Sequence, residues 1–162
     1  MAVTPNGFIA KTDDDTSWIS KDEWKSYSQF CRNAGNLIVG RRTYNILTKQ
    51  PEFLDLKNVK VVVVSHQEIE LIAPNHYLVH SPEEAIDLFK DEKEVIIGGG
   101  GKTNASFLEK NLIDEIYLDV EPIIFSEGIS LFHDMKFETG LELIEIKNIT
   151  KDELQLHYKV LK

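Results

Sequence analysis

Short apolar runs rich in valine and isoleucine recur along this chain of 162 residues, and stretches with helical periodicity separate them. Runs that are apolar at consecutive positions are typical of strands that are covered on both faces. The sequence predicts strands over residues 36–40, 59–65, 77–80, 94–98 and 113–125. Because strands and helices alternate as far as residue 125, we expect a largely parallel sheet.

Helix start and stop signals lie between these runs. Ser20 followed by Glu23 has the pattern of a capping box, and Gly35 is expected to end that helix. Ser81 and Pro82 indicate the start of a second helix. A short helix is expected over residues 42–48, and Ala105, Leu108 and Leu112 mark another that starts after residue 101. The helices thus fall between successive strands, as an α/β fold requires.

The C-terminal part of the chain has a different pattern. Residues 141–149 and 153–161 alternate between apolar and polar side chains on either side of a predicted turn at residues 150–152. Alternation of this kind across a short turn indicates an antiparallel hairpin. We therefore expect a single α/β domain over residues 1–162, with a mostly parallel central sheet and an antiparallel hairpin added at its edge.

Composition excludes several functions. A net charge of −9 repels polyphosphate backbones, which disfavours nucleic-acid binding. A single cysteine rules out an internal disulfide, and five scattered histidines without ligand spacing predict no metal site. There is no pattern of a membrane span or of a signal peptide, so we expect a cytoplasmic protein whose partner is a small molecule.

Four consecutive glycines, Gly98, Gly99, Gly100 and Gly101, form the strongest local motif. They follow Ile97 at the end of a predicted strand and precede a helix that opens with Lys102 and Thr103. Glycine lets the backbone come close to a ligand, and the N–H groups at a helix start attract phosphate. The alternative is a tight turn, although four glycines carry an entropic cost that a turn does not require.

A second motif, Gly40-Arg41-Arg42-Thr43-Tyr44, also joins the end of an apolar strand to a helix start. Arginine donates pairs of hydrogen bonds to phosphate, and Thr43 adds a hydroxyl group. Taken alone, the motif is equally consistent with two solvated arginines. Because ligands of open α/β sheets bind at the carboxyl ends of strands, the two motifs together predict a nucleotide with several phosphates.

These motifs occur in an order that resembles the dihydrofolate reductase superfamily. The similarity runs from residues 2–10 (AVTPNGFIA) through Trp18, residues 40–44 and Ser65 to the four glycines, residues 112–116 (LIDEI) and Pro122. It is closest to the branch that includes the reductase domain of bacterial riboflavin biosynthesis. The resemblance covers nearly the whole chain and implies a three-layer sandwich with NADPH lying across the edge of the sheet.

The resemblance also implies roles for individual residues. Gly40, Arg41, Arg42 and Thr43 would hold the pyrophosphate and the 2′-phosphate, and Ser65 would lie at the adenosine end. Residues 97–103 would bind the pyrophosphate from the opposite side, and Ala2 and Ile9 would line the nicotinamide. An arginine pair beside the ribose favours NADPH over NADH because of the additional phosphate charge.

The reaction implied is hydride transfer to a C=N or C=O bond of a pterin-like or aminopyrimidine-like substrate, in a homodimer. The alternative is a nucleotide-binding protein of the same fold without turnover. For proton transfer, Asp119 shares a strand face with Tyr117 and Glu121, unless that face is open to solvent or to a partner. Glu23 is a second candidate, although its place in the capping box would explain it equally well.

Two further residues are candidates for contact with the substrate. Asp22 is a weaker acidic candidate next to Glu23. Trp18 would either close over the nicotinamide or pack as a hydrophobic staple on the following helix. The sequence departs from the family pattern at its start, where relatives have more residues in the first strand, and at Asn6, where an aspartate is common in this branch.

Overall fold

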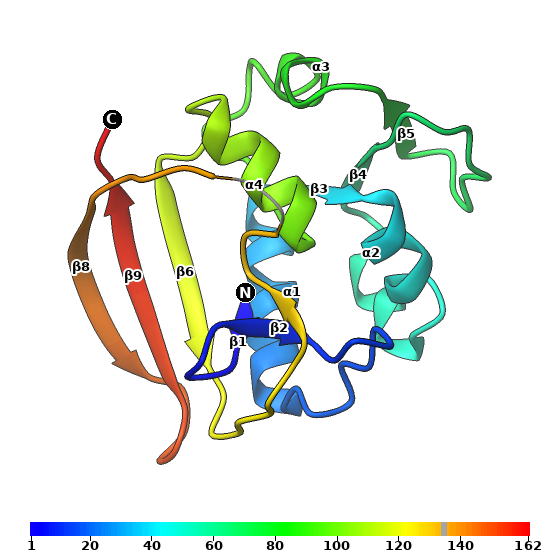
Figure 1. The fold of residues 1–162 in the computed structure, drawn as a ribbon. Coiled ribbons are helices and arrows are strands. Elements are labelled where there is room, and N and C mark those ends of the chain that lie inside the picture. Colours follow the sequence, from blue (N-terminus) through cyan, green and yellow to red (C-terminus); the bar gives the residue numbers. More distant parts are fainter. Residues whose placement is uncertain (134–135) are drawn as a thin grey trace.

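The computed structural model describes residues 1–133 and 136–162. Four α-helices and one 3-10 helix are present in this part of the chain: α1 (Lys21–Ala34), α2 (Arg41–Leu47), η1 (Pro51–Leu56), α3 (Pro82–Asp87) and α4 (Gly101–Glu109). The strands are β1 (Ala2–Val3), β2 (Phe8–Ala10), β3 (Asn36–Gly40), β4 (Lys60–Val64), β5 (His76–Val79), β6 (Glu115–Val120), β7 (Ile129–Ser130), β8 (Leu141–Asn148) and β9 (Leu154–Val160). Figure 1 shows their arrangement.

The strands form a parallel part and a mixed part. β3, β4 and β5 are parallel neighbours in that order, as their apolar runs predicted. The second sheet has the order β1-β6-β9-β8, with β1 parallel to β6 and the last two strands antiparallel. β2 and β7 pair separately. The predicted C-terminal hairpin is therefore confirmed, and it lies at the edge of the sheet.

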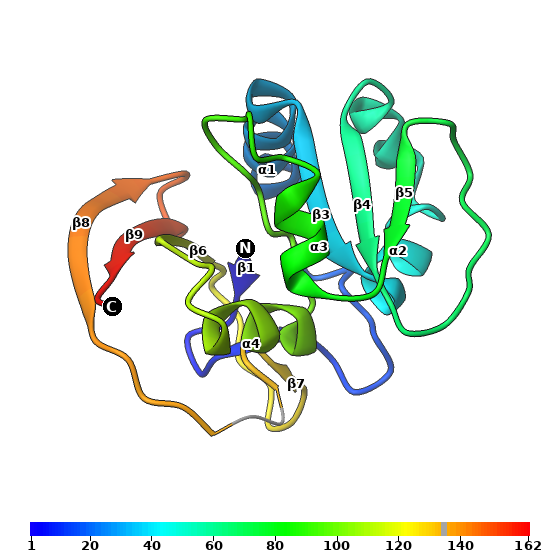
Figure 2. The same ribbon diagram turned by 90° about the horizontal axis from the view of Figure 1, so that it is seen from above.

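Helices cover both faces of β3 and β4, which makes the three layers of the sandwich (Figure 2). Side chains at odd positions of these strands, such as Leu37 and Val61, pack on Cys31 of α1 and Tyr44 of α2. Side chains at even positions, such as Ile38, pack on α3 and α4. Burial on both faces explains why these strands are apolar at every position.

Cys31 lies at the centre of the layer between α1 and the sheet. Its side chain is completely buried, and burial raises the pKa of its thiol to about 12. The thiolate is the reactive form of cysteine, so this thiol is inert in the folded protein. It serves as a small apolar side chain in the core.

The helix caps follow the sequence signals at two helices. The hydroxyl of Ser20 accepts a hydrogen bond from the N–H of Glu23, and Gly35 ends α1 in the left-handed region with a φ of 73°. Ser81 caps α3 in the same way through the N–H of Glu84. The helix expected to start at Lys102 begins one residue earlier, at Gly101, because the last glycine of the run adopts helical geometry, and it ends at Glu109, before Leu112.

The expected strand over residues 94–98 is not a regular strand. Among the described residues it forms a single parallel bridge, between Ile97 and Ile38. The side chain of Asn36 supports it instead: its amide donates to the carbonyl of Glu94 at 2.7 Å, and its oxygen accepts from the N–H of Ile96 at 2.9 Å. A regular strand in mid-sheet needs a neighbour on each side, and this segment has β3 on one side and a groove on the other.

The groove has a volume of about 700 Å³ and separates residues 94–97 from β6. β1 pairs with β6 only through Ala2 and Val3, which lie opposite Asp119 and Val120. The central sheet is thus mostly parallel but divided along this line. The prediction of one strand over residues 113–125 was also too long, because β6 ends at Val120.

Replacement of Asn36 by leucine tests how residues 94–96 are held. The variant keeps a similar volume but removes hydrogen bonds to Ala34, Glu94 and Ile96, so their partly buried backbone groups lose these partners. We expect a loss of at least about 2 kcal/mol in the free energy of unfolding, measured in urea. Asn58→Leu, at an exposed position, is the control. Equal losses in both variants would contradict this role of Asn36.

Candidate functional site

The two glycine motifs come into direct contact in the folded protein. The N–H of Gly40, at the end of β3, donates a hydrogen bond to the carbonyl of Gly99 at 2.7 Å. β3 and residues 94–98 run parallel, so both motifs lie at the same edge of the sheet. The sequence placed these motifs 58 residues apart, and the sheet brings them together.

Several of these glycines are required by close packing. A Cβ atom at Gly40 would collide with the hydroxyl of Thr103, and a Cβ at Gly98 would lie 2.7 Å from Leu37 and against the hydroxyl of Tyr27. Gly99 has a φ of +89°, which L-residues rarely adopt. The glycine run is therefore more than a flexible turn, because its backbone packs closely against α1, β3 and α4.

The helices that follow the two motifs begin without a side-chain cap. Gly40 and Gly100 are the N-cap residues of α2 and α4, and neither can supply a capping oxygen. α1 and α3, in contrast, are capped by Ser20 and Ser81. Uncapped N–H groups at a helix start are donors for an anionic ligand. This set of donors fits the pyrophosphate of a dinucleotide.

Side chains with hydroxyl and basic groups surround this glycine-lined surface. A Cβ atom at Gly100 would lie 3.0 Å from the hydroxyl of Thr43 and 3.9 Å from Cδ1 of Ile9, so these two side chains flank Gly100. Arg41 and Lys102 are exposed at the starts of α2 and α4. The structure thus brings together Ile9, Thr43, Thr103 and the glycines, as the resemblance implied.

Arg42 has a partner in the loop between β2 and α1. Its Nε atom donates to the carboxylate of Asp14 at 2.7 Å, and its side chain remains 64% exposed. The ion pair ties this loop to the start of α2. The guanidinium group keeps its remaining donors, because the contact with Asp14 uses Nε.

The other two predicted cofactor residues have different surroundings. Ala2 is buried in β1, opposite Asp119 in the register with β6. Ser65 lies at the end of β4, where its hydroxyl bonds to the carbonyl and the N–H of Gln67. The N–H of Ser65 donates to the carbonyl of Val79 at 2.9 Å, and its carbonyl lies 2.8 Å from Nδ1 of His80. The hydroxyl and the backbone of Ser65 therefore both have partners within the fold.

Four buried carboxyl groups gather between α1 and the sheet. Glu23, Asp119, Glu121 and Glu153 are each 3–4% exposed. Glu121 accepts the N–H of Ser20 at 2.7 Å, and Glu153 accepts its hydroxyl at 3.0 Å. We call these four residues the acidic cluster. The structure contradicts the suggestion that this face of β6 is open to solvent.

The capping-box explanation of Glu23 is wrong. In a capping box the glutamate side chain would accept the N–H of Ser20, but Glu121 occupies that position. The carboxyl group of Glu23 makes no hydrogen bond with any residue of 1–133 or 136–162. Its position in the helix therefore leaves the carboxyl group available for a ligand.

Burial raises the pKa of Glu23 to about 7, and the negative charges of Asp119, Glu121 and Glu153 act in the same direction. The pKa of Glu153 is also raised, mainly by burial. A carboxyl group with a pKa near neutrality can hold a proton and release it under physiological conditions.

Asp119 is held at the floor of the acidic cluster. Its carboxylate accepts a hydrogen bond from the amide of Gln155 at 2.7 Å and one from the amino group of Met1 at 3.0 Å. Gln155 lies directly opposite Asp119 in the register of β6 and β9. Sequence reasoning did not single out Gln155 or Glu153, and the pairing of the predicted hairpin with β6 is the signal that could have found them.

Tyr27 connects the acidic cluster with the glycine run. It lies one helical turn after Glu23 on α1, and its hydroxyl is the group that a Cβ at Gly98 would meet. Burial raises the pKa of Tyr27 well above its usual value, and the charge of Glu23 contributes. The acidic cluster and the glycine-lined surface are thus neighbouring parts of one site.

The remaining candidates lie at the margin of this site. Trp18 packs edge-on against Phe125, with ring centres 5.5 Å apart, and its Nε1 donates to the carbonyl of Asp15. The ring of Trp18 thus contacts Phe125, in the segment after β6. Asp22 is exposed in the first turn of α1.

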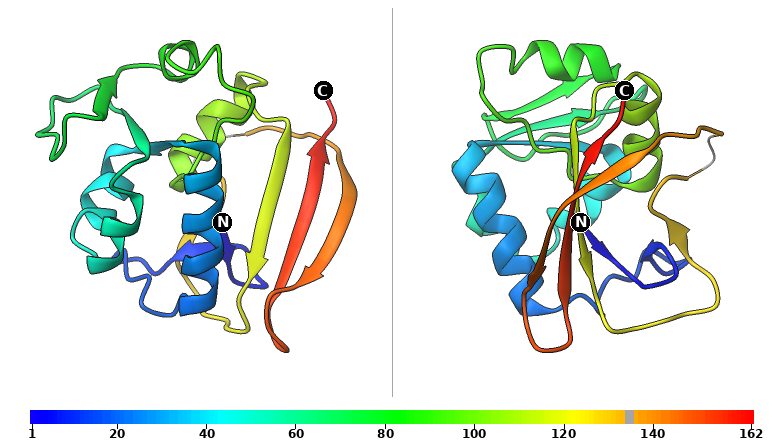
Figure 3. Two further views of the ribbon diagram at one scale, coloured as in Figure 1. Left: turned by 180° about the vertical axis from the view of Figure 1, so that it is seen from behind. Right: turned by 90° about the vertical axis from the view of Figure 1, so that its left-hand side faces the viewer.

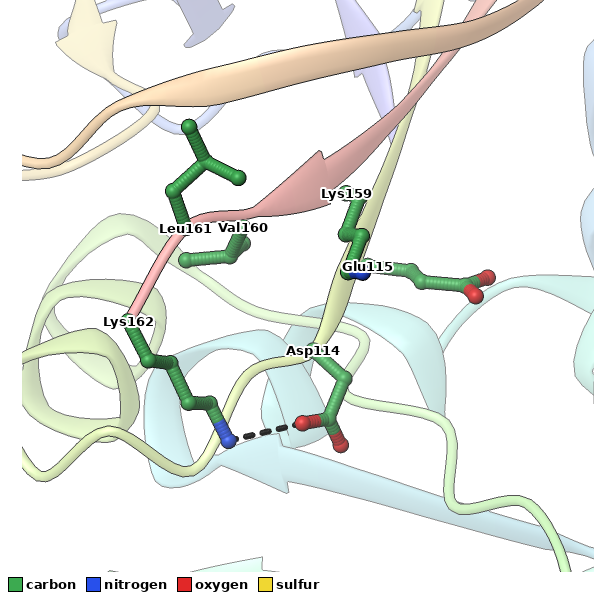
Figure 4. A pocket seen from close by; sticks show the side chains of 6 residues that line it. All are labelled: Asp114, Glu115, Lys159, Val160, Leu161 and Lys162. Atoms are coloured by element: carbon green, nitrogen blue, oxygen red, sulfur yellow. Dashed lines mark hydrogen bonds and ion pairs between the residues drawn. The ribbon is translucent and has the colours of Figure 1, made fainter.

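A second, shallower pocket of about 350 Å³ lies where β6 begins and β9 ends (Figure 4). The amino group of Lys162 and the carboxylate of Asp114 bridge it at 2.7 Å. In the described part of the chain, no three His, Cys, Asp or Glu side chains are arranged to hold a metal ion. None of the described helices is long and apolar enough to cross a membrane.

A three-layer sandwich with glycine-lined loops at the carboxyl ends of its parallel strands defines a protein with the dihydrofolate-reductase-like fold. The family described as the RibD C-terminal domain matches residues 1–154. The chain belongs to this family, and the resemblance read from the sequence is confirmed.

Similar proteins cover nearly the whole chain. The protein YwjB of Bacillus subtilis (strain 168) is 29% identical, and the match covers 98% of this chain and 94% of YwjB. A putative riboflavin biosynthesis protein from Shewanella sp. PV-4 superposes with a TM-score of 0.80 at 20% identity, over 100% of this chain and 97% of that one. A deaminase/5-amino-6-(5-phosphoribosylamino)uracil reductase from Thermotoga maritima gives a TM-score of 0.71 at 18% identity, over 99% of this chain and 55% of that one.

The pH dependence of stability tests the environment of Glu23. The folded protein favours the protonated carboxyl group, so its stabilising effect is complete below pH 4.5 and is lost as the pH rises toward about 7. Glu23→Gln, which remains neutral, removes this contribution to the slope. We expect the variant to gain stability relative to the wild type between these values, as measured by urea unfolding at a series of pH values.

Asp22→Asn is the matched control, because Asp22 is exposed one residue away on the same helix turn. The control should follow the wild-type pH profile. If Glu23→Gln and the wild type show the same slope between pH 4.5 and 7, the carboxyl group does not have the raised pKa described above.

Proposed function

We propose that this protein is an NADPH-dependent reductase that transfers hydride to a C=N or C=O bond of a small heterocycle. The observation that carries the proposal is the contact between Gly40 and Gly99, which joins two uncapped helix starts at one edge of the sheet. Membership of the RibD C-terminal domain family supports it. The acidic cluster next to this edge supplies a group for proton transfer.

The glycine-lined surface would hold the phosphates of the cofactor. The first N–H groups of α4 and the hydroxyls of Thr43 and Thr103 would donate to the pyrophosphate. Arg41 and Arg42 would bind the 2′-phosphate by charge-assisted hydrogen bonds. Ala2 and Ile9 would present apolar surface to the nicotinamide. NADPH, when bound, supplies the hydride.

Glu23 would supply the proton. Its carboxyl group is buried, has no hydrogen-bond partner within the described residues and has a pKa raised to about 7. At neutral pH it can therefore give a proton to a ring nitrogen or a carbonyl oxygen as hydride arrives. Asp119, held by Gln155, would orient the substrate through an N–H or amino group.

The acidic cluster favours substrates that carry several N–H donors. Carboxylates accept hydrogen bonds, and pterins and aminopyrimidines offer ring N–H and amino groups along one edge. The reductase from Thermotoga maritima is described as acting on 5-amino-6-(5-phosphoribosylamino)uracil, which has this character. We propose a substrate of this class and a homodimeric assembly.

Titration of the purified protein with NADPH and NADH, followed by calorimetry, tests the cofactor assignment. We expect NADPH to bind more tightly, with an affinity that decreases as salt is added. Arg41→Ala and Arg42→Ala should each weaken NADPH binding by about tenfold and leave NADH binding almost unchanged, because only NADPH has the 2′-phosphate.

Lys49→Ala is the control, since Lys49 is exposed after the C-terminal end of α2 rather than at its start. The assignment fails if neither nucleotide binds. If the arginine variants retain the wild-type preference for NADPH, these arginines do not recognise the 2′-phosphate.

Turnover distinguishes a reductase from a protein that only binds the nucleotide. With 5-amino-6-(5-phosphoribosylamino)uracil and dihydropterin as trial substrates, loss of NADPH absorbance should report activity. Glu23→Gln should lower kcat by about a hundredfold and change the Kd for NADPH by less than about threefold, because a proton donor acts in the chemical step. Asp119→Asn should mainly raise KM. Equal effects of Glu23→Gln on binding and turnover would contradict a role in proton transfer.

A further inference from the structure

The C-terminal hairpin ends the larger sheet in a long edge strand. β8 is the last strand in the order β1-β6-β9-β8, and all eight of its residues are exposed. Its inner edge pairs with β9, which leaves backbone N–H and C=O groups along its outer edge. Figures 1 and 3 show β8 at the margin of the molecule. An edge strand of this length is a template for another strand.

Apolar side chains project from one face of β8. Leu143 lies opposite Tyr158 of β9, and Ile146 lies opposite Leu156. Tyr158 and Leu156 are two apart on β9 and share a face, so Leu143 and Ile146, which lie opposite them, point to the same side of the sheet. They are 48% and 58% exposed. Uncovered apolar side chains beside an unpaired strand edge mark a contact surface.

Charged side chains lie on the opposite face of β8. Glu142 lies opposite Lys159, and Lys147 lies opposite Gln155, which share a face of β9. A register shift between Leu143 and Glu145 adds one residue to β8 and makes this arrangement possible. The side chains of Glu142 and Lys147 therefore point to the same face of the sheet, and the two residues lie equally far from the midpoint of the strand.

We infer that β8 of one copy pairs antiparallel with β8 of a second copy, about a two-fold axis between Ile144 and Glu145. In this register Glu142 lies opposite the partner's Lys147, and Leu143 lies opposite the partner's Ile146. The two-fold axis repeats each pair. The inference names the surface of the homodimer and does not depend on the reductase activity.

Two pairs, Glu142 with the partner's Lys147 and Leu143 with the partner's Ile146, are complementary in this register, and the adjacent registers lose both pairs. A shift of the register by one residue would place Leu143 against the partner's Lys147, and the two residues point to opposite faces. It would also place Glu145 against the partner's Glu145, and like charges in direct opposition destabilise a sheet. Two copies with a net charge of −9 repel each other, so a contact between them requires local charge pairs of this kind.

Sedimentation equilibrium of the full chain, over a range of concentrations, tests the inference with a charge swap. The wild type should form a dimer. Because the two-fold axis repeats each pair, Glu142→Lys creates two pairs of opposed lysines, and Lys147→Glu creates two pairs of opposed glutamates. Each variant should therefore raise the Kd for dimerisation by about tenfold. The double variant, with both changes, restores opposite charges and should return to within about threefold of the wild type.

The sign of the effect separates specific pairing from general repulsion. Glu142→Lys makes each copy less negative, so repulsion between net charges alone would tighten the dimer, whereas the pairing predicts a weaker one. The control is Lys49→Glu, which changes an exposed charge just after α2 instead of on β8. It should leave the Kd within about threefold of the wild-type value. The three substituted positions are exposed, and circular dichroism should confirm that all variants fold.

Three outcomes would overturn the inference. The first is a wild type that stays monomeric at all concentrations. The second is a dimer whose Kd in both single variants equals that of the wild type, which would show that another surface forms it. The third is a double variant that dimerises no better than the single variants, because the charges would then not lie opposite each other.

Discussion

The close approach of two backbones with no side chain between them is the contact on which the site depends. The N–H of Gly40 meets the carbonyl of Gly99 at 2.7 Å, and larger residues at Gly40 or Gly98 would collide with their neighbours. Both segments follow buried apolar residues, whose packing fixes the position of each segment along the strand direction. The first N–H groups of α2 and α4, the helices that start from these segments, therefore lie at the same edge of the sheet. Asn36 maintains this geometry from the other end of the segment.

Features with local causes could be predicted from the sequence, and those with distant causes could not. The cap of α1 at Ser20, its end at Gly35 and the alternating hairpin depend on neighbouring residues, and they are confirmed. The segment 94–98 carries the composition of a strand, but a strand in the middle of a sheet also needs a ladder on each side. One side of this segment faces a groove, which cannot be deduced from the residues of the segment itself.

The same distinction holds in the candidate site. The glycine motifs could be found because their chemistry is written in consecutive residues. The acidic cluster could not be found in full, because Glu121 takes the N–H of Ser20 from 101 positions away and displaces the expected partner. Gln155 reaches Asp119 only through the register of two strands. Contacts of this kind follow from strand pairing, which the sequence determines only indirectly.

The single cysteine of the chain lies in the core layer beneath α1, with no exposed surface and a thiol pKa near 12. A thiol reagent in solution can reach Cys31 only when α1 separates from the sheet. Labelling at this one position would therefore occur at the rate and with the free energy of that opening. The extent of labelling of Cys31, measured by mass spectrometry on the unmodified chain, would thus report how often the helix that carries Glu23 separates from the sheet.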